Sequence, residues 1–377
     1  SALVLHSTLP RFMFPDFLKI AILLLLLSII HVAPTYEIVV VGRRKAPESA
    51  KADRSGVNIT VKPSKIMQKG GRLSDALAQS PGVSQRSTGG VGHLSLLMIR
   101  GSSPAQVNWY LDGFRIMGGA GGTLDAGAIP LAGIGRISLF KSAVPLELGV
   151  EGIGGAVNII PLRPTKNVMA CFHTLGSHGT MATSFVLGGT TPFTQTVAGS
   201  ILTTRGDYRY FYDNGTEFTR IDDGFRRRTN NRVLRGNLLY SLSKRLLGTS
   251  FRVYGTYGAN ENRVPGPGSI VTRNTRYSYD RGAVMLKAIR RTGAFRIAGG
   301  AWAEGVWDSF EDPFGELGVG VQKDRSRVLT GGGLLFGTWR RGRHSITFGG
   351  RGNSSVLLAT KLMRTDAQHE KRFQLSA

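Results

Sequence analysis

The sequence predicts a small α/β domain followed by an antiparallel β-barrel of the membrane type. Two observations carry this prediction. Strand-like runs recur from about residue 166 onward, and the connections between them are alternately short and long. Gly makes up 51 of the 377 residues, about twice its usual share. With 41% hydrophobic residues the chain is not of the disordered type, and its lone cysteine, Cys171, excludes a disulfide scaffold.

The chain is strongly basic, with a formal net charge of +24. The excess is spread over the sequence, and the only dense block is Arg226-Arg227-Arg228. A spread excess favours attraction to anionic surfaces or ligands. Since no nucleic-acid-binding motif gathers the charge, we expect no nucleic acid among the partners.

The N-terminal segment has the pattern of a signal peptide. Arg11 and Lys19 precede an apolar run at residues 20–30, and the small residue Ala33 follows it. The run is shorter than a membrane-spanning helix needs, so we predict a signal peptide over residues 1–33. A membrane anchor is the alternative interpretation. Either one takes the protein out of the cytoplasm.

Residues 57–161 are expected to form the α/β domain. Residues 58–62 alternate like a strand, and Leu73, Ala76, Leu77 and Ser80 have helical spacing before Pro81-Gly82 stops the helix. Asp112-Gly113 is a turn signal between two apolar runs. Further strands are expected at 94–100, 107–111, 136–140 and 156–160.

Several motifs of this segment occur in a distinctive order. They are Leu73-Ser-Asp-Ala-Leu77 with Ser80-Pro-Gly-Val83, Met98-Ile-Arg100-Gly101, Tyr110-Leu-Asp112-Gly113, Gly135-Arg-Ile-Ser-Leu139 and Gly152-Ile-Gly154-Gly155-Ala-Val-Asn158-Ile159. In this order they resemble the plug domain of TonB-dependent outer-membrane receptors. The resemblance makes Arg100, Gly101, Asp112, Gly113, Gly154, Gly155 and Asn158 the plug motif residues. The chain departs from the family at Gly135 and Ser138, where glutamates are common.

The resemblance also gives a role to a short strand-like segment before the domain. Glu37, Ile38, Val39, Val40 and Val41 lie where the family carries its TonB box. An extended peptide of this kind can add as an edge strand to a partner protein. A plug edge strand or a plain linker is the alternative. We assign residues 34–56 to the TonB box and a flexible linker.

The remaining residues, 162–377, are expected to contribute the barrel. The expected strands lie at 166–175, 180–188, 194–204, 229–241, 248–258, 276–290, 294–308, 325–339 and 344–355. Along 248–258, Phe251, Val253 and Tyr257 fall on one face, and Arg252 and Tyr254 fall on the other. This period of two suits lipid on the outside and water on the inside.

The connections support the barrel more strongly than any single strand does. Short ones at 189–193, 242–247, 291–293 and 340–343 alternate with long ones at 205–228, 259–275 and 309–324. Transmembrane barrels have short periplasmic turns and long outer loops, and lipid requires closed strand edges. The resemblance implies 22 strands, of which this chain would supply about 10. We therefore expect a fragment or a truncated gene product.

Few residues point to a specific ligand, and none to catalysis. Tyr208, Tyr210, Arg226, Arg227 and Arg228 in the first long connection are candidates for ligand binding at the outer mouth. Asp213, Asp222 and Asp223 could bind calcium, although a solvated acidic loop is the simpler interpretation. No histidine pair has metal-ligand spacing, and no nucleophile or phosphate-binding motif is present, so we expect no enzyme, metal or cofactor.

The resemblance implies TonB-dependent active transport across the outer membrane of a Gram-negative cell. The expected ligand is a ferric siderophore or a similar small chelate. The expected partners are TonB with its inner-membrane energising complex and outer-membrane lipid with lipopolysaccharide. The alternatives are a non-transporting plug-and-barrel protein in signalling or envelope assembly, a truncated inactive receptor and a soluble basic binding module.

Overall fold

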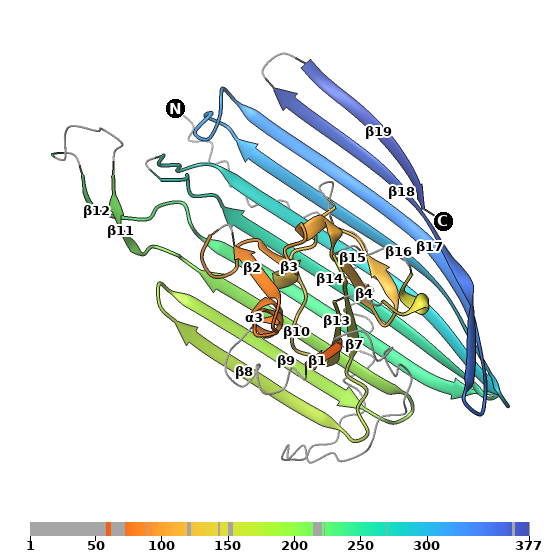
Figure 1. The fold of residues 1–377 in the computed structure, drawn as a ribbon. Helices are drawn as coiled ribbons and strands as arrows, with labels where there is room; N and C mark the ends of the chain where they lie inside the picture. The colour runs from red at the N-terminus through yellow and green to blue at the C-terminus, as the bar shows by residue number, and fades with distance from the viewer. Residues whose placement is uncertain are drawn as a thin grey trace, which may run out of the picture. The chain divides into compact units, whose positions relative to one another are not determined.

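The computed structural model describes residues 58–61, 72–87, 89–118, 122–141, 144–149, 154–213, 221, 223–268, 270–363 and 366–376. By its contacts the chain divides into Ser1–Val41 and Gly42–Ala377. All described residues lie in the second unit. They form an N-terminal domain (residues 58–161) and a large antiparallel sheet (Figure 1).

The N-terminal domain is built on a five-stranded sheet with the order β1-β6-β7-β4-β5. Its strands are β1 (Asn58–Val61), β4 (Asn108–Leu111), β5 (Phe114–Ile116), β6 (Ile134–Phe140) and β7 (Ala156–Pro161). Only β4 and β7 pair in parallel; the other neighbours are antiparallel. A separate hairpin joins β2 (Val83–Ser87) to β3 (Ser95–Ile99). Short 3-10 turns are η1 (Pro104–Gln106), η2 (Ala126–Ala128) and η3 (Leu146–Leu148).

The one α-helix of the described residues, α3 (Leu73–Ala78), follows from its sequence. The backbone N–H of Arg72 donates to Asp75 Oδ2 at 3.0 Å, which stabilises the first turn. Leu73, Ala76 and Leu77 share one buried face, as their spacing predicts. The chain then turns at Gly82, which has a φ of +73° that disfavours other residues. The expected helix and its stop are confirmed.

The second sheet has ten antiparallel strands, and each pairs with its neighbour along the chain. Their order runs from β8 at one edge to β19 at the other (Figure 1). The strands are β8 (Val168–Gly176), β9 (Thr180–Gly189), β10 (Thr194–Thr204), β13 (Val233–Leu246), β14 (Thr249–Arg263), β15 (Arg276–Thr292), β16 (Phe295–Asp312), β17 (Gln322–Arg341), β18 (His344–Met363) and β19 (Asp366–Ser376). Between β10 and β13 a separate hairpin pairs β11 (Arg209–Tyr212) with β12 (Gly224–Arg227).

The order of the expected strands is confirmed, but several of the expected bounds were wrong, and β14, β16 and β17 extend into the connections expected at 259–275 and 309–324. The strand expected at 229–241 starts at Val233 and continues to Leu246, because Leu247 and Gly248 alone make the turn. Both have positive φ, 50° and 78°, as in the favoured two-residue hairpin turn. The connection 205–228 contains the β11–β12 hairpin. Residues beyond 355 extend β18 and form β19.

The two faces of the ten-stranded sheet differ as a membrane barrel requires. On β15, Leu286 is 52% exposed whereas the neighbouring Met285 is fully buried. The outward face carries further exposed apolar side chains, among them Ile201, Leu335, Ile346 and Phe348. Such alternation fits lipid outside. None of the helices among the described residues is long and apolar enough to cross a membrane, a result that concerns helices alone.

The inward face packs against the N-terminal domain. One cluster of buried side chains joins residues of that domain, such as Leu111, Phe114 and Ile137, to Met285 and Trp302 of the sheet. The rings of Phe114 and Trp302 lie 5.9 Å apart. Among the described residues, however, no strand of the N-terminal domain pairs with the ten-stranded sheet. The two parts therefore meet through side chains and loops.

Candidate functional site

The turn between β4 and β5 is the centre of the polar contacts between the two parts. Asp112 and Gly113 form it with positive φ values of 46° and 92°. The backbone N–H of Asp112 donates to the carbonyl of Ile159 at 2.8 Å, and that of Gly113 donates to Asn158 Oδ1 at 3.1 Å. Three plug motif residues are thus brought together, since Asn158 on β7 holds the turn that Asp112 and Gly113 make.

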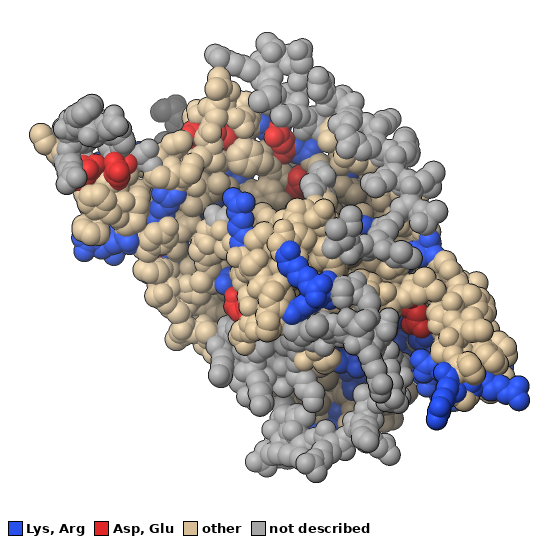
Figure 2. Space-filling model, viewed as in Figure 1, with Lys and Arg blue, Asp and Glu red and all other residues tan. Residues whose placement is uncertain are grey.

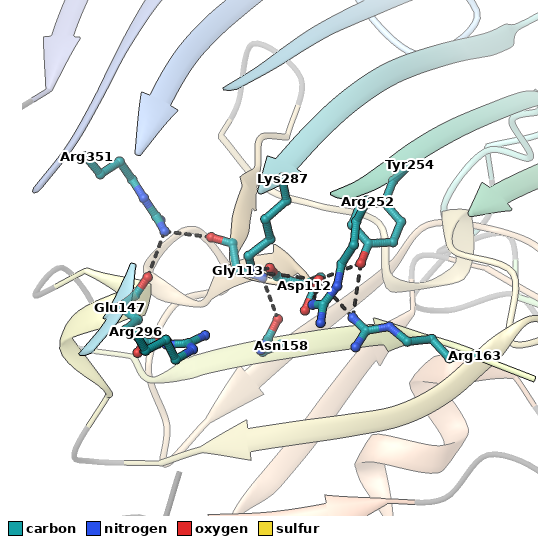
Figure 3. A network of polar contacts seen from close by, with 10 residues as sticks. All are labelled: Asp112, Gly113, Glu147, Asn158, Arg163, Arg252, Tyr254, Lys287, Arg296 and Arg351. Carbon is teal, nitrogen blue, oxygen red and sulfur yellow. Dashed lines mark hydrogen bonds and ion pairs between the residues drawn. The ribbon is translucent and has the colours of Figure 1, made fainter. Parts of the chain in front are cut away.

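The carboxylate of Asp112 binds a group of side chains from outside its own domain (Figure 3). Its Oδ2 accepts hydrogen bonds from Arg252 Nη1 at 2.9 Å and Tyr254 OH at 2.5 Å, both on β14. Arg163 Nη2, from the segment between β7 and β8, donates at 3.0 Å. Lys287 of β15 lies 3.7 Å from the same oxygen and also donates to the Asp112 carbonyl. One buried carboxylate therefore joins two barrel strands.

The charges around Asp112 keep it ionised. Burial by itself raises the pKa of this carboxyl, because it disfavours the charged form. Lys287, Arg163 and Arg252 outweigh burial and lower the pKa to about 2. The ion contact is therefore intact throughout the physiological pH range.

A second set of contacts holds the neighbouring backbone. Arg351 of β18 donates from Nη2 to the Gly113 carbonyl at 2.6 Å and to the Glu147 carbonyl at 3.1 Å (Figure 3). The Glu147 carboxylate accepts from Arg296 Nη1 of β16 at 2.6 Å. The Asp112 turn and η3 are thereby fixed to the same end of the ten-stranded sheet.

Two further carboxylates, each in an ion pair, tie the N-terminal domain to other strands. Asp125 and Arg235 of β13 are 2.6 Å apart and almost fully buried. The other oxygen of Asp125 accepts the backbone N–H groups of Ser95 and Gly127 at 3.0 and 2.9 Å. On β16, Glu304 pairs with Arg281 at 2.5 Å and accepts the Met117 N–H at 3.0 Å. Each carboxylate therefore bridges the domain and the sheet.

Two glycines of the plug motif, Gly154 and Gly155, are explained by close backbone approach. A Cβ atom at Gly154 would lie 2.7 Å from the Gln106 carbonyl oxygen, and one at Gly155 would lie 2.5 Å from that of Phe140. Gly155 also has a φ of +82°. At the end of β3, Arg100 and Gly101 have positive φ, and Arg100 is exposed with its N–H donating to the Gly82 carbonyl. These two residues lie apart from the Asp112 contacts.

The expected ligand-binding residues gather on the β11–β12 hairpin and beside it. Tyr208, Tyr210 and Tyr212 form a row with centroid spacings of 6.3 and 6.4 Å. Arg228 lies over the Tyr210 ring at 5.1 Å and Arg226 over the Tyr212 ring at 3.6 Å. Arg227, on the other face of β12, pairs with Asp207. Arginines stacked on rings suit a planar or anionic ligand.

Two of the sites predicted from the sequence, the TonB box and the acidic loop, cannot be placed in full. The segment Glu37–Val41 and Asp222 lie outside the described residues. Within the described part of the chain, no group of three or more His, Cys, Asp or Glu residues could hold a metal ion.

Sequence reasoning missed most of the partners of Asp112. The alternation along β14 did place Arg252 and Tyr254 on the inner face. The same parity rule applied to β15 and β18 would have found Lys287 and Arg351, because charged residues on the inner face of a closed barrel must meet water or a polar partner. No sequence signal indicated which of them would reach Asp112.

Comparisons with known proteins agree with this architecture. Residues 51–156 match the family model described as "TonB-dependent Receptor Plug Domain". The vitamin B12 transporter BtuB of Vibrio cholerae (serotype O1, strain O395) is 32% identical over 145 residues, which are 38% of this chain and 24% of BtuB. This chain thus spans about a quarter of that curated relative.

Two solved structures show the same fold over most of the chain. The copper transporter OprC aligns with a TM-score of 0.64 and 14% identity, covering 82% of this chain and 47% of OprC. The ferric yersiniabactin uptake receptor FyuA of Yersinia pestis aligns with a TM-score of 0.57 and 15% identity, covering 83% of this chain and 51% of FyuA. This chain spans about half the length of each.

Proposed function

We propose that the chain carries the plug domain and part of the β-barrel of a TonB-dependent receptor of the Gram-negative outer membrane, and that it serves TonB-dependent uptake of an extracellular ligand. The proposed ligand is a ferric siderophore or a similar metal chelate. The names of the matched proteins support this class, since they include ferric-chelate, vitamin B12 and copper transporters.

The observation that carries the proposal is the way in which the plug (residues 58–161) is held. In the described residues no backbone ladder joins it to the barrel sheet; it is held instead by the ion pairs of Asp112 and Asp125 and by the hydrogen bond from the Met117 N–H to Glu304. Side-chain contacts can be released and remade without breaking either sheet. A plug that opens and closes a transport path needs this kind of attachment.

The proposed sequence of events uses these parts in order. A ligand binds at the outer side, where the β11–β12 hairpin presents Tyr208, Tyr210 and Arg226–Arg228. TonB then pairs with the extended segment Glu37–Val41 by strand addition. A pull on that segment shifts the plug against the Asp112 contacts, and the ligand passes inward. TonB and its energising complex supply the work, so no covalent chemistry is needed.

Deletion of residues 37–41 tests the proposal. The full chain is expressed in a host that lacks its own receptors, and uptake of a panel of radiolabelled ferric chelates and cobalamin is measured. We expect TonB-dependent uptake of at least one chelate, lost in the deletion variant while binding to whole cells persists.

Two outcomes would contradict the proposal. Uptake that survives the deletion, or that is equal in a host without TonB, would show that residues 37–41 are not the TonB contact. Binding without uptake by the unaltered chain in a TonB-proficient host would favour a role in signalling or an inactive receptor.

A further inference from the structure

Most of the short-turn end of the barrel sheet carries basic residues, although the β9–β10 turn, residues 190–193, has none. The turns β13–β14, β15–β16 and β17–β18, with the start of β8, bear these exposed cations, named here the basic rim: Lys166, Lys244, Arg245, Arg290, Arg291, Arg340, Arg341 and Arg343. Figure 2 shows blue side chains gathered at the lower right, where the strand ends β15–β18 of Figure 1 meet. The same turn segments contain no Asp or Glu.

The opposite, long-loop end of the sheet is different. There Glu311 pairs with three cations, Arg276, Lys323 and Arg325. By contrast, Arg290, Arg291, Arg341 and Arg343 form no ion pair with any residue that the structure describes. Arg296, which faces Arg291 across the β15–β16 pair, is already paired with Glu147. Because the four arginines have no acidic partner among the described residues, an anion from outside the chain would stabilise this end.

The surroundings of the basic rim indicate which anion. The outward face beside it is apolar: Phe251, Phe295, Ile297, Ile346 and Phe348 are between 46% and 58% exposed. Trp339 lies across from Phe295 on one side and Ile346 on the other, immediately before Arg340. Aromatic residues followed by cations mark the boundary between hydrocarbon and headgroups. A soluble acidic protein would leave the apolar part of this surface uncovered.

We propose that the basic rim binds the headgroups of anionic phospholipids in the membrane leaflet on the short-turn side. The lipid phosphate meets the arginines and lysines while the acyl chains contact Phe295, Ile346 and Phe348. This inference rests on the placement in the membrane that the proposed function assumes. It adds a lipid partner and fixes the depth of the barrel in the bilayer, with the short turns at the headgroup level.

Fluorescence quenching at Trp339 tests the inference directly. The full chain is reconstituted in phosphatidylcholine bilayers in which one fifth of the lipid, on the order of a native anionic fraction, is either brominated phosphatidylglycerol or brominated phosphatidylcholine. The signal of Trp339 is the difference between the unaltered chain and Trp339→Phe. We expect brominated phosphatidylglycerol to quench Trp339 about threefold more strongly or better. The preference should shrink in about 1 M salt, where the screening length falls to about 3 Å.

A matched pair of variants locates the effect. Removing four cations of the basic rim (Arg290→Gln, Arg291→Gln, Arg341→Gln and Arg343→Gln) should abolish the preference for the anionic lipid. Removing four cations of the β11–β12 segment (Arg209→Gln, Arg226→Gln, Arg227→Gln and Arg228→Gln) should leave it unchanged.

Each remaining outcome is decisive. Equal quenching by both lipids in the unaltered chain would overturn the lipid inference but would agree with the membrane placement. An acidic periplasmic protein would then be the partner to test for the basic rim. Quenching by neither lipid would show that Trp339 lies outside the bilayer. That result would overturn both the inference and the membrane placement. If the rim variant does not fold, the salt dependence of the unaltered chain still decides.

Discussion

Asp112 shows how one residue joins two structural roles. Its backbone makes the turn that the Leu-Asp-Gly motif predicted, and Asn158 supports the same turn. Its carboxylate forms ion pairs with Arg163, Arg252 and Lys287. The motif could be found in the sequence because it is local. The cations could not, because they lie 51, 140 and 175 residues further along the chain and their meeting depends on how the chain folds between.

Replacement of Asp112 by Asn should strongly destabilise the packing of the plug against the barrel sheet. The change leaves buried cations without their carboxylate, and breaking a buried ion pair in this way costs about 3–5 kcal/mol. Urea unfolding of the full chain in detergent measures the difference. The control Asp207→Asn breaks the exposed pair with Arg227 and should cost no more than about 1 kcal/mol. Equal effects of the two variants would contradict a special role for Asp112.

The pH dependence of Asp112 follows from its lowered pKa. The folded value of about 2 lies below the ordinary 3.8, so ionised Asp112 stabilises the folded chain above pH 3.8. That contribution, about 2 kcal/mol, is lost as the pH falls through 2. The stability difference between the unaltered chain and Asp112→Asn should therefore be constant above about pH 5 and shrink toward pH 2. A difference that shrinks near pH 6 would refute this assignment.

At the scale of elements, the alternation of short and long connections predicted the barrel strands in their correct order. The residues at which the strands begin and end were harder to predict from the sequence. Leu247 is apolar and 96% exposed in a turn, so the sequence around it did not signal a tight hairpin. The β11–β12 hairpin was missed because its strands are short and mix Arg with aromatic residues. Such a pattern is equally compatible with a loop.

Two long connections are held together by a single carboxylate. Glu316 Oε2 accepts the backbone N–H groups of Arg273, Asn274 and Thr275 at 2.9, 2.9 and 3.1 Å. Burial tends to raise its pKa, but the N–H groups of Asn274 and Arg273 outweigh it and lower the pKa to about 2. The segment before β15 is therefore anchored to the segment after β16.

Glu316→Ala should release this anchor. We expect amide hydrogen exchange at Arg273–Thr275 to accelerate about tenfold or more, since a hydrogen bond to a charged group stabilises by about 1.5–3 kcal/mol. The control is Glu311→Ala, because the contacts of Glu311 are with the side chains of Arg276, Lys323 and Arg325. Unchanged exchange in Glu316→Ala, or equal acceleration in both variants, would mean that the anchor does not order these loops.

For the molecule as a whole, the separation of plug and barrel into two sheets matters most. The resemblance predicted a plug and a barrel from the order of local motifs. It did not predict that Asp112, Asp125 and Glu304 would each bridge the two parts. Those contacts join residues that are far apart in the sequence, so no local motif signals them. The apolar cluster around Phe114 and Trp302 adds to the attachment. The proposed transport requires that this attachment open when TonB pulls on the plug and re-form afterwards.

A reversible lock between plug and barrel tests that requirement most directly. A Cβ atom at Gly92 of the plug would lie 3.4 Å from the Cβ atom of Val233 on β13, close to the roughly 3.5–4.5 Å of a disulfide. The same Cβ atom would lie 2.5 Å from Leu202 Cδ2, and Gly92 has a φ of +86°, so the single variant Gly92→Cys measures the effect of this strain alone. Gly92→Cys and Val233→Cys are combined with Cys171→Ser, and the single-cysteine variants serve as controls. Ligand binding and uptake are measured with the disulfide formed and after reduction.

We expect the oxidised chain to bind the chelate without importing it and reduction to restore uptake, while the single-cysteine variants import under both conditions. Undiminished import by a fully formed lock would show that the ligand passes without displacement of the plug from β13, and would contradict the account.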